Sequence, residues 1–318
     1  MAKRAKVARR SRTAKFPKVP AGELLTLHDF VRYAVSRFVE AKLVFAHGTT
    51  DPVSEAAFLV CETLHLHPDQ FEVFASARVT SLEANAILQV IARRISTRKP
   101  AAYLVNKIYM RGLPFYVDER VIVPRSFIGE LLESHFGGEG DNGGPLIEDP
   151  AEVKSVLDLC TGSGCLAVLA SRHFPNAQIE AIDISKDALE VAARNIADYG
   201  VEERVRLHRG DLFKPIGEAR YDLIISNPPY VDEQGMANLP RECRAEPKLA
   251  FAGGADGLDI IRRILKEAGD HLTPHGGLLC EFGRGRASVE AAFPQLPLLW
   301  LDTEDSEGEV FWIGAGEL

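Results

Sequence analysis

The tetrapeptide Asn227-Pro228-Pro229-Tyr230 directly follows a strongly apolar segment, residues 221–226. The Asn227 side-chain oxygen and the Pro228 carbonyl are acceptors that can hold the two hydrogens of a planar amino or amide group. Such a nitrogen is a poor nucleophile because its lone pair is delocalised, and two aimed acceptors favour a pyramidal geometry that directs the lone pair at an electrophile. Proline fixes the backbone and removes a competing N–H donor. The motif therefore predicts a site that positions a planar nitrogen for in-line displacement, with no metal and no covalent nucleophile.

An ordinary Asn-Pro turn at the end of a strand is the simpler alternative for this tetrapeptide. Its place at the carboxyl end of an apolar strand, where the crevice of a parallel sheet should lie, favours a functional site. We therefore predict that Asn227, Pro228 and Tyr230 act in catalysis, and that Pro229 joins them in binding the substrate. The Tyr230 ring can stack on a planar amide or base. No dedicated strong base is required, because the nitrogen becomes acidic once it has bonded to the electrophile.

A second group of candidate residues surrounds the turn Gly162-Ser163-Gly164, which follows the apolar segment ending in Asp158-Leu-Cys160. Two glycines permit a tight turn and a close approach of backbone to a ligand at the edge of a sheet. The spacing Gly162-x-Gly164-x-x-Ala167, with Asp183 about twenty residues further on, also fits a dinucleotide-binding motif. Asp158 separates the two interpretations, because an acid at this turn repels a pyrophosphate and attracts the ammonium and sulfonium groups of S-adenosylmethionine.

Two further acids follow the next two strands. Asp183 ends the second strand and can accept hydrogen bonds from both ribose hydroxyls, and Asp211, after the third, can bond the adenine amine. Leu212 adds a backbone donor and an apolar face. Each acid alone would more often be a helix cap or a turn residue, and Asp183 before Ser185 fits that interpretation. Their occurrence at three successive strand ends predicts an S-adenosylmethionine site at the carboxyl edge of a sheet.

The elements that must position these residues alternate between strands and helices, which predicts a parallel sheet with right-handed crossovers. An antiparallel pair near the end of the chain, residues 296–301 and 309–314, completes a mostly parallel seven-stranded, Rossmann-like α/β sheet in residues 151–318. The five parallel strands are predicted at residues 155–160, 178–183, 205–210, 221–226 and 277–282.

The preceding segment, residues 21–98, is predicted to form a small helical domain. Apolar residues recur at three- and four-residue steps from Leu27 to Val39, Asp51-Pro52 is a helix start, and Thr80 to Glu83 is a capping box. From Pro100 to Pro124 we expect short extended pieces with a β-hairpin around Arg111-Gly112. A short helix at 127–136 and a glycine-rich break at 137–145 complete the linker region, residues 99–150.

The composition limits the class of protein. The chain has 318 residues, 46% of them hydrophobic, with no apolar run long enough to cross a bilayer and no apolar segment after the basic N-terminus that would mark a secretory signal. The five cysteines include no Cys-x-x-Cys pair, which argues against a disulfide framework and a zinc site and favours a reducing, cytoplasmic setting. They are Cys61, Cys160, Cys165, Cys243 and Cys280.

Residues 1–20 form a leader with eight Lys and Arg residues and no acid. The rest of the chain contains 29 Lys and Arg residues and 45 Asp and Glu residues, so it is strongly acidic. The leader is interpreted first as a solvated, disordered segment. An electrostatic tether to RNA, such as that of the ribosome, is the functional alternative, and an Arg-rich transit peptide is a third.

With these residues in hand, the chain resembles the HemK-like protein-(glutamine) methyltransferases. The resemblance covers nearly everything after the leader and includes Asp158–Ala170, Ala181–Ser185, Gly210–Phe213, Asn227–Val231 and Glu246–Leu258. It implies a class I methyltransferase domain after a helical substrate-recognition domain, with Asn227, Pro228, Pro229 and Tyr230 on the amide of a glutamine in a translation protein. It places the cofactor, S-adenosylmethionine, among Cys160, Thr161, Gly162, Ser163, Gly164, Asp183, Leu212 and Asn227.

The segment VIVPRSFIGELL (Val121–Leu132) is similar to the branch of that family that methylates large-subunit ribosomal protein three. The resemblance therefore implies a ribosomal-protein substrate, on assembling large subunits. The family pattern does not explain the leader, so its contact with RNA remains an expectation from its charge alone. Peptide release factors are the alternative substrates within the family. A nucleic-acid adenine methyltransferase also remains, because similar tetrapeptides hold flipped bases, although the acidic body offers no basic face for phosphates. A non-enzymatic ribosome-assembly factor that keeps the fold is the third alternative.

Overall fold

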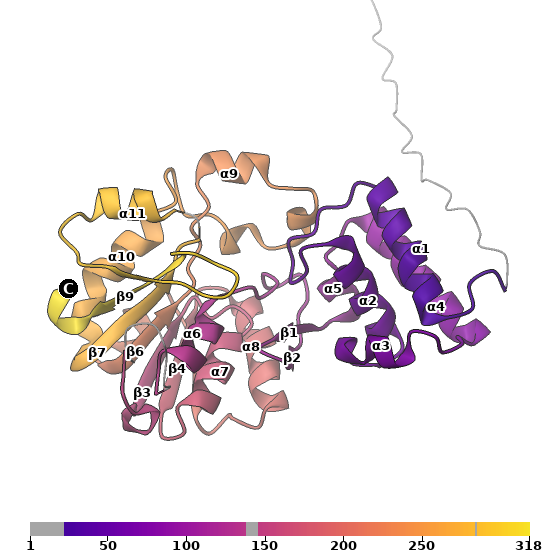
Figure 1. Ribbon diagram of the computed structural model, residues 1–318. Coiled ribbons are helices and arrows are strands. Elements are labelled where there is room, and N and C mark those ends of the chain that lie inside the picture. Colours follow the sequence, from indigo (N-terminus) through magenta and orange to yellow (C-terminus); the bar gives the residue numbers. More distant parts are fainter. Residues whose placement is uncertain (1–21, 138–145, 284) are drawn as a thin grey trace, which may run out of the picture. The chain divides into compact units, whose positions relative to one another are not determined.

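The computed structural model describes residues 22–137, 146–283 and 285–318 (Figure 1). The predicted leader, residues 1–20, and most of the predicted glycine-rich break, residues 138–145, lie outside the described residues. The chain divides into two compact units, one ending at Val105 and the other beginning at Asn106. None of the described helices is long and apolar enough to cross a membrane.

The first unit is helical, and the helix starts predicted at Asp51 and Thr80 are confirmed. Asp51 caps the second helix by accepting from the backbone N–H groups of Val53 and Ser54, and Thr80 and Glu83 form the capping box of the fourth. A buried ion pair, Arg94 to Glu55 at 2.7 Å, joins two of the helices. Between residues 22 and 105 the α-helices are α1 (Leu27–Glu40), α2 (Pro52–Thr63), α3 (Phe71–Phe74), α4 (Ser81–Thr97) and α5 (Ala101–Val105).

The segment after Pro100 differs from the prediction, because residues 101–105 form α5 instead of an extended piece. Four of its five residues, Ala101 to Leu104, are buried, so packing overrides the β propensity of Tyr103 and Val105. The predicted hairpin follows as β1 (Ile108–Met110) and β2 (Leu113–Phe115), paired antiparallel. Arg111 and Gly112 at its tip have φ of 47° and 73°, as a two-residue type I′ turn requires.

The second unit contains the predicted sheet, seven strands in the order β5-β4-β3-β6-β7-β9-β8. The first five strands of this order are parallel, and β9 is antiparallel to both β7 and β8, so the predicted closing pair is confirmed. The strands are β3 (Ser155–Leu159), β4 (Gln178–Asp183), β5 (Val205–Arg209), β6 (Tyr221–Ser226), β7 (Leu272–Glu281), β8 (Leu299–Leu301) and β9 (Val310–Gly314).

Strand β7 begins at Leu272, five residues before the predicted start at 277. Pro274 and the glycines at 276 and 277 are unusual inside a strand, so nothing in the sequence indicated this earlier start. The pairing of β7 with β6 includes a register shift between Tyr221 and Leu223. Among the described residues of this unit, six helices accompany the sheet. Figure 1 shows how they are arranged around it. They are α6 (Ile128–Ser134), α7 (Cys165–His173), α8 (Lys186–Asp198), α9 (Glu233–Asn238), α10 (Asp259–Glu267) and α11 (Arg286–Ala292).

Candidate active site

A cavity of about 300 Å³ lies at the carboxyl edge of the parallel strands, within the second unit. This volume is at the lower end of the range of small-molecule sites. The cavity brings together predicted residues from the ends of four strands, namely Cys160, Gly162, Asp183, Asp211, Leu212, Asn227 and Pro229. The other predicted residues stand outside its lining, namely Asp158, Thr161, Ser163, Gly164, Pro228 and Tyr230.

The turn between β3 and α7 requires glycine for both conformation and space. Gly162 and Gly164 have φ of 55° and 76°, in the left-handed region. A Cβ at Gly164 would lie 3.0 Å from the Cβ of Ala192 on α8, so a larger residue would push this helix away. A Cβ at Gly162 would meet no protein atom closer than 4.0 Å, and Gly162 lines the cavity. The turn therefore leaves open space where a ligand could approach its backbone.

Asp183 joins this turn to the next strand. Its carboxylate accepts hydrogen bonds from the backbone N–H of Gly162, at 2.9 Å, and of Ser185, at 2.8 Å. The local-turn role considered for Asp183 is therefore present. A carboxylate has about four acceptor positions, so capacity remains on the side that lines the cavity. Burial raises the pKa of Asp183, which makes a hydrogen-bonding partner in the cavity more favourable.

Asp158 lies behind the turn and is fully buried. The Thr161 hydroxyl donates to its carboxylate at 2.5 Å. Burial raises the pKa of Asp158 to about 7, and the nearby Asp183 carboxylate adds to the increase while the Thr161 bond opposes it. Because Asp158 is not part of the cavity wall, it can influence a bound cation through space and through the shape of the turn.

Asp211 is paired with two cations. Its oxygens accept from Lys214 and from Arg263 of α10, each at 2.7 Å. These bonds lower the pKa of Asp211, so the group is a stable carboxylate. Arg263 also lines the cavity, which the sequence analysis did not predict. Leu212, buried and with φ of 51°, adds an apolar wall beside it.

The Asn227–Val231 loop after β6 is fixed by the segment 251–257. The Val231 N–H donates to the Phe251 carbonyl at 2.7 Å, and the Gly253 N–H donates back to the Val231 carbonyl at 2.9 Å. A Cβ at Gly253 would lie 2.7 Å from the Cα of Tyr230, so only glycine permits this approach. The two motifs therefore form one rigid unit of backbone.

The Tyr230 ring packs on Phe282, with ring centroids 5.6 Å apart, and burial raises its pKa. A Cβ at Gly283 would lie 2.9 Å from this ring. The structure thus holds Tyr230 against the end of β7, outside the cavity lining. Its stacking on a substrate amide remains a prediction.

Glu281, which ends β7 and is 2% exposed, was not predicted as a site residue from the sequence. Its carboxylate accepts from the Asn227 side-chain amide at 2.9 Å, from the Ser126 hydroxyl at 2.7 Å and from the Phe127 N–H at 2.9 Å. Burial raises its pKa to about 7. The sequence contained the information needed to predict it, because Glu281 is an acid at the end of an apolar strand, the same feature that identified Asp183.

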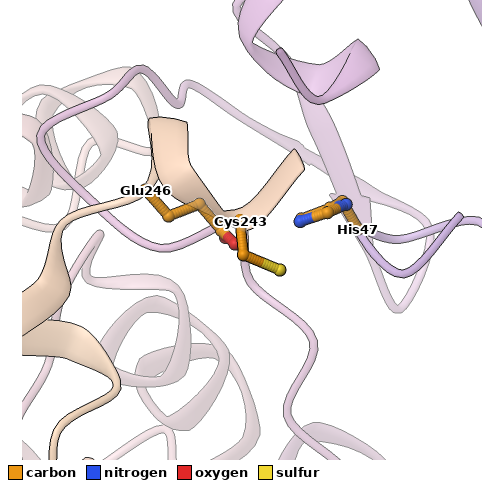
Figure 2. A group of neighbouring side chains, drawn as sticks. All are labelled: His47, Cys243 and Glu246. Atoms are coloured by element: carbon orange, nitrogen blue, oxygen red, sulfur yellow. The ribbon is translucent and has the colours of Figure 1, made fainter. Parts of the chain in front are cut away.

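A second buried carboxylate, Glu246, holds the same segment. It accepts from the Val123 N–H at 2.9 Å and pairs with Arg125 at 3.1 Å. Glu246 follows the short helix η4 (Glu242–Ala245), and Figure 2 shows its side chain beside that of Cys243. Burial raises the pKa of the Cys243 thiol to about 11, and the Glu246 carboxylate adds to this, so Cys243 stays a neutral thiol.

The chain is similar to known methyltransferases. A family model described as "Methyltransferase small domain" matches residues 144–241. A ribosomal protein uL3 glutamine methyltransferase of Bradyrhizobium diazoefficiens is 72% identical over 319 residues, with 100% of each chain covered. Proteins of the same name from Burkholderia pseudomallei and Neisseria meningitidis serogroup B are 53% and 49% identical, covering 92% and 94% of this chain and 95% and 96% of theirs.

Similarity at this level over the full length confirms the resemblance stated for residues 121–132. The family model covers the strands β3 to β6, so this part of the sheet belongs to a methyltransferase domain. The chain belongs to the family of ribosomal protein uL3 glutamine methyltransferases.

Proposed function

We propose that this chain transfers a methyl group from S-adenosylmethionine to the side-chain amide nitrogen of a glutamine in ribosomal protein uL3. The names of relatives up to 72% identical support this substrate. The observation that carries the proposal is the shared cavity, because Asn227 lines the same space as Asp183 and Asp211. An amide clamp and acceptors for a nucleoside therefore meet at one edge of one sheet.

The cavity fits this cofactor in its chemistry. Asp183 offers acceptor positions for ribose hydroxyls, and Asp211 for the adenine amine, on a wall that is otherwise apolar at Leu212 and Ile260. The turn at Cys160–Gly164, including Thr161 and Ser163, would hold the methionine part, where Asp158 favours positive charge. S-adenosylmethionine, when bound, supplies an electrophilic methyl group on a sulfonium.

The residues of the chain supply position and orientation. The Asn227 side-chain oxygen and the Pro228 carbonyl accept the two amide hydrogens of the substrate glutamine, which holds its nitrogen in line with the methyl group. Pro229 lines the cavity and stiffens the loop, and Tyr230 would stack on the amide of the bound glutamine. The hydrogen bonds from Val231 and Gly253 keep the loop from moving when the substrate binds.

The remaining parts of the chain are assigned to substrate recognition. None of the described residues of the helical unit lines the cavity, and the unit exposes the large apolar side chains of Val73, Phe74 and Leu82, which are available to a protein partner. The leader, residues 1–20, would contact RNA of assembling large subunits through its eight cations. Action on a ribosomal protein implies a cytoplasmic place of work.

Two other substrates define the test. A release factor would also present a glutamine, and an adenine base would present an amino group to Asn227. The acidic body of the chain, 29 cations against 45 acids without the leader, disfavours the nucleic acid. Purified enzyme, labelled cofactor and ribosomal particles lacking the modification should give label in uL3, located by mass spectrometry at one glutamine. Label in RNA or only in a release factor would overturn the proposal.

The same assay tests the clamp. Asn227→Ala should lower turnover by about 10²–10³-fold, because one oriented acceptor is lost, while cofactor affinity falls only modestly. Asn176→Ala is the matched control. Asn176 precedes the amino end of β4 and does not line the cavity, and its side chain donates to the Ala151 carbonyl. A uL3 with glutamate at the target position should not be methylated, because a carboxylate offers no hydrogens to Asn227. Near-normal turnover by Asn227→Ala would refute the clamp.

A further inference from the structure

Glu281 and Asn227 follow neighbouring positions of two paired strands. Ser226 of β6 is the register partner of Cys280 of β7, so the next residues, Asn227 and Glu281, lie side by side at the carboxyl edge. The Asn227 Nδ2 donates to Glu281 Oε1 at 2.9 Å. An ionised carboxylate is an acceptor only, so it can face the NH₂ end of an amide and not its oxygen. The Asn227 oxygen is therefore turned away from Glu281.

We propose that Glu281 is a positioning residue that fixes which end of the Asn227 amide faces the substrate, and thereby selects a substrate group that carries hydrogens. This inference rests on the proposed function, because it concerns the orientation of the clamp that binds the glutamine amide. In the opposite orientation, Asn227 would present its own NH₂ to the NH₂ of the substrate, and two donors would meet.

Glu281 is itself held so that it cannot turn. Its other oxygen, Oε2, accepts from the Ser126 hydroxyl at 2.7 Å and from the Phe127 N–H at 2.9 Å. The backbone N–H of Phe127 is a fixed donor, whereas the Ser126 hydroxyl can rotate and also accept. Oε2 is thus committed to the Pro-Arg-Ser segment, and Oε1 is left to Asn227.

A glutamine at this position tests the idea with almost no change in shape. In Glu281→Gln, the single oxygen is drawn to the fixed N–H of Phe127 and the Ser126 hydroxyl, which leaves the new NH₂ facing Asn227. Two NH₂ groups cannot bond each other, so the Asn227 amide should flip and present its NH₂ to the substrate. The enzyme should then prefer an acceptor at the substrate position.

The experiment uses the full-length enzyme at pH 8. Burial raises the pKa of Glu281 to about 7, so the carboxylate is mostly ionised at this pH. Turnover of uL3 and the Kd values of two uL3 forms, with glutamine or with glutamate at the target position, are measured for wild type and Glu281→Gln. The variant should lose roughly 10²-fold in kcat. Its preference for the glutamine form over the glutamate form should fall by about 10-fold or more.

The control is Asp222→Asn. Asp222 is a hydrogen-bonded carboxylate at the start of β6, where it accepts from Ser155 and Thr273, roughly 16 Å along the strand from Asn227. This change should alter stability and leave the preference between the two uL3 forms as in wild type. A merely structural role of Glu281 would make the two variants alike, and an unchanged preference in Glu281→Gln overturns the proposal.

If Glu281→Gln does not fold, Glu281→Asp is the variant that tests the proposal. It keeps a carboxylate, whose oxygens only accept hydrogen bonds, so the orientation of the Asn227 amide should be preserved. Its kcat should fall while its preference for the glutamine form stays that of wild type, and a lost preference would contradict the inference. A wild-type enzyme that methylates no uL3 would instead refute the proposed function itself.

Discussion

Asp183→Ala is the most informative test of the cofactor site. The carboxylate has about four acceptor positions, and two are used by the N–H groups of Gly162 and Ser185. Asp183 lines the cavity, where its remaining acceptor positions would accept from ribose hydroxyls. Their loss should cost on the order of 1–3 kcal/mol, which is a roughly 5–150-fold increase in the Kd of S-adenosylmethionine. Isothermal titration calorimetry well below the melting temperature measures this directly.

The change also removes an acceptor from two backbone N–H groups, so a loss of stability must be separated from a loss of binding. Asp51→Ala is the matched control, because Asp51 likewise accepts from two backbone N–H groups, those of Val53 and Ser54, and lines no part of the cavity. It should cost about 1 kcal/mol of folding free energy and leave cofactor affinity unchanged. Cofactor binding by Asp183→Ala at the wild-type Kd would refute the assignment of this carboxylate to the ribose.

Three further outcomes are expected. Because burial raises the pKa of Asp158 from 3.8 to about 7, the folded protein binds more protons than the unfolded chain in that window, and this carboxyl destabilises the fold as pH rises. The difference in unfolding free energy between Asp158→Asn and wild type should therefore shift in favour of the variant as pH rises from 4 to 7, by at most about 1.4 kcal/mol per pH unit. Thermal unfolding measures this difference, and a value that does not change with pH would contradict the reasoning. Gly253→Ala, whose Cβ would lie 2.7 Å from Tyr230 Cα, should lower kcat and leave cofactor affinity, measured by calorimetry, nearly intact. Deleting residues 1–18 should weaken sedimentation with ribosomal particles in a salt-dependent way and spare activity on a short peptide, and a collapse of peptide activity would exclude a tethering role.

The strand ends could be predicted from the sequence because each combines an apolar run with a polar residue that stops it. Strands β4 and β6 have the predicted bounds, and Asp183 and the Asn227 loop lie at their carboxyl ends as expected. Parallel pairing then brings residues from distant parts of the chain to one edge. This rule explains why seven of the predicted residues share a cavity.

Contacts between strands were beyond the sequence analysis. The bond from Asn227 to Glu281 joins residues 54 positions apart, and it depends on the lateral register of β6 and β7. Lys214, three residues after Asp211, was a foreseeable partner for that acid, whereas Arg263 comes from α10, 52 residues further on. Helix α5 was missed because burial of its side chains, not local propensity, decides its conformation.

The distribution of charge along the cavity agrees with the proposed orientation of the cofactor. Asp158 and Asp183, near the glycine turn, make no ion pair with any residue that the structure describes, and burial raises both pKa values. Asp211, beyond the third parallel strand, is neutralised by Lys214 and Arg263. At one end of the site, therefore, two carboxyl groups have no cationic partner among the described residues, and a bound cation would favour their ionised form; at the other end the carboxylate is already paired. A ligand with its ammonium and sulfonium at one end and an uncharged adenine at the other matches this difference, whereas a dinucleotide would place its pyrophosphate where the negative charge is greatest.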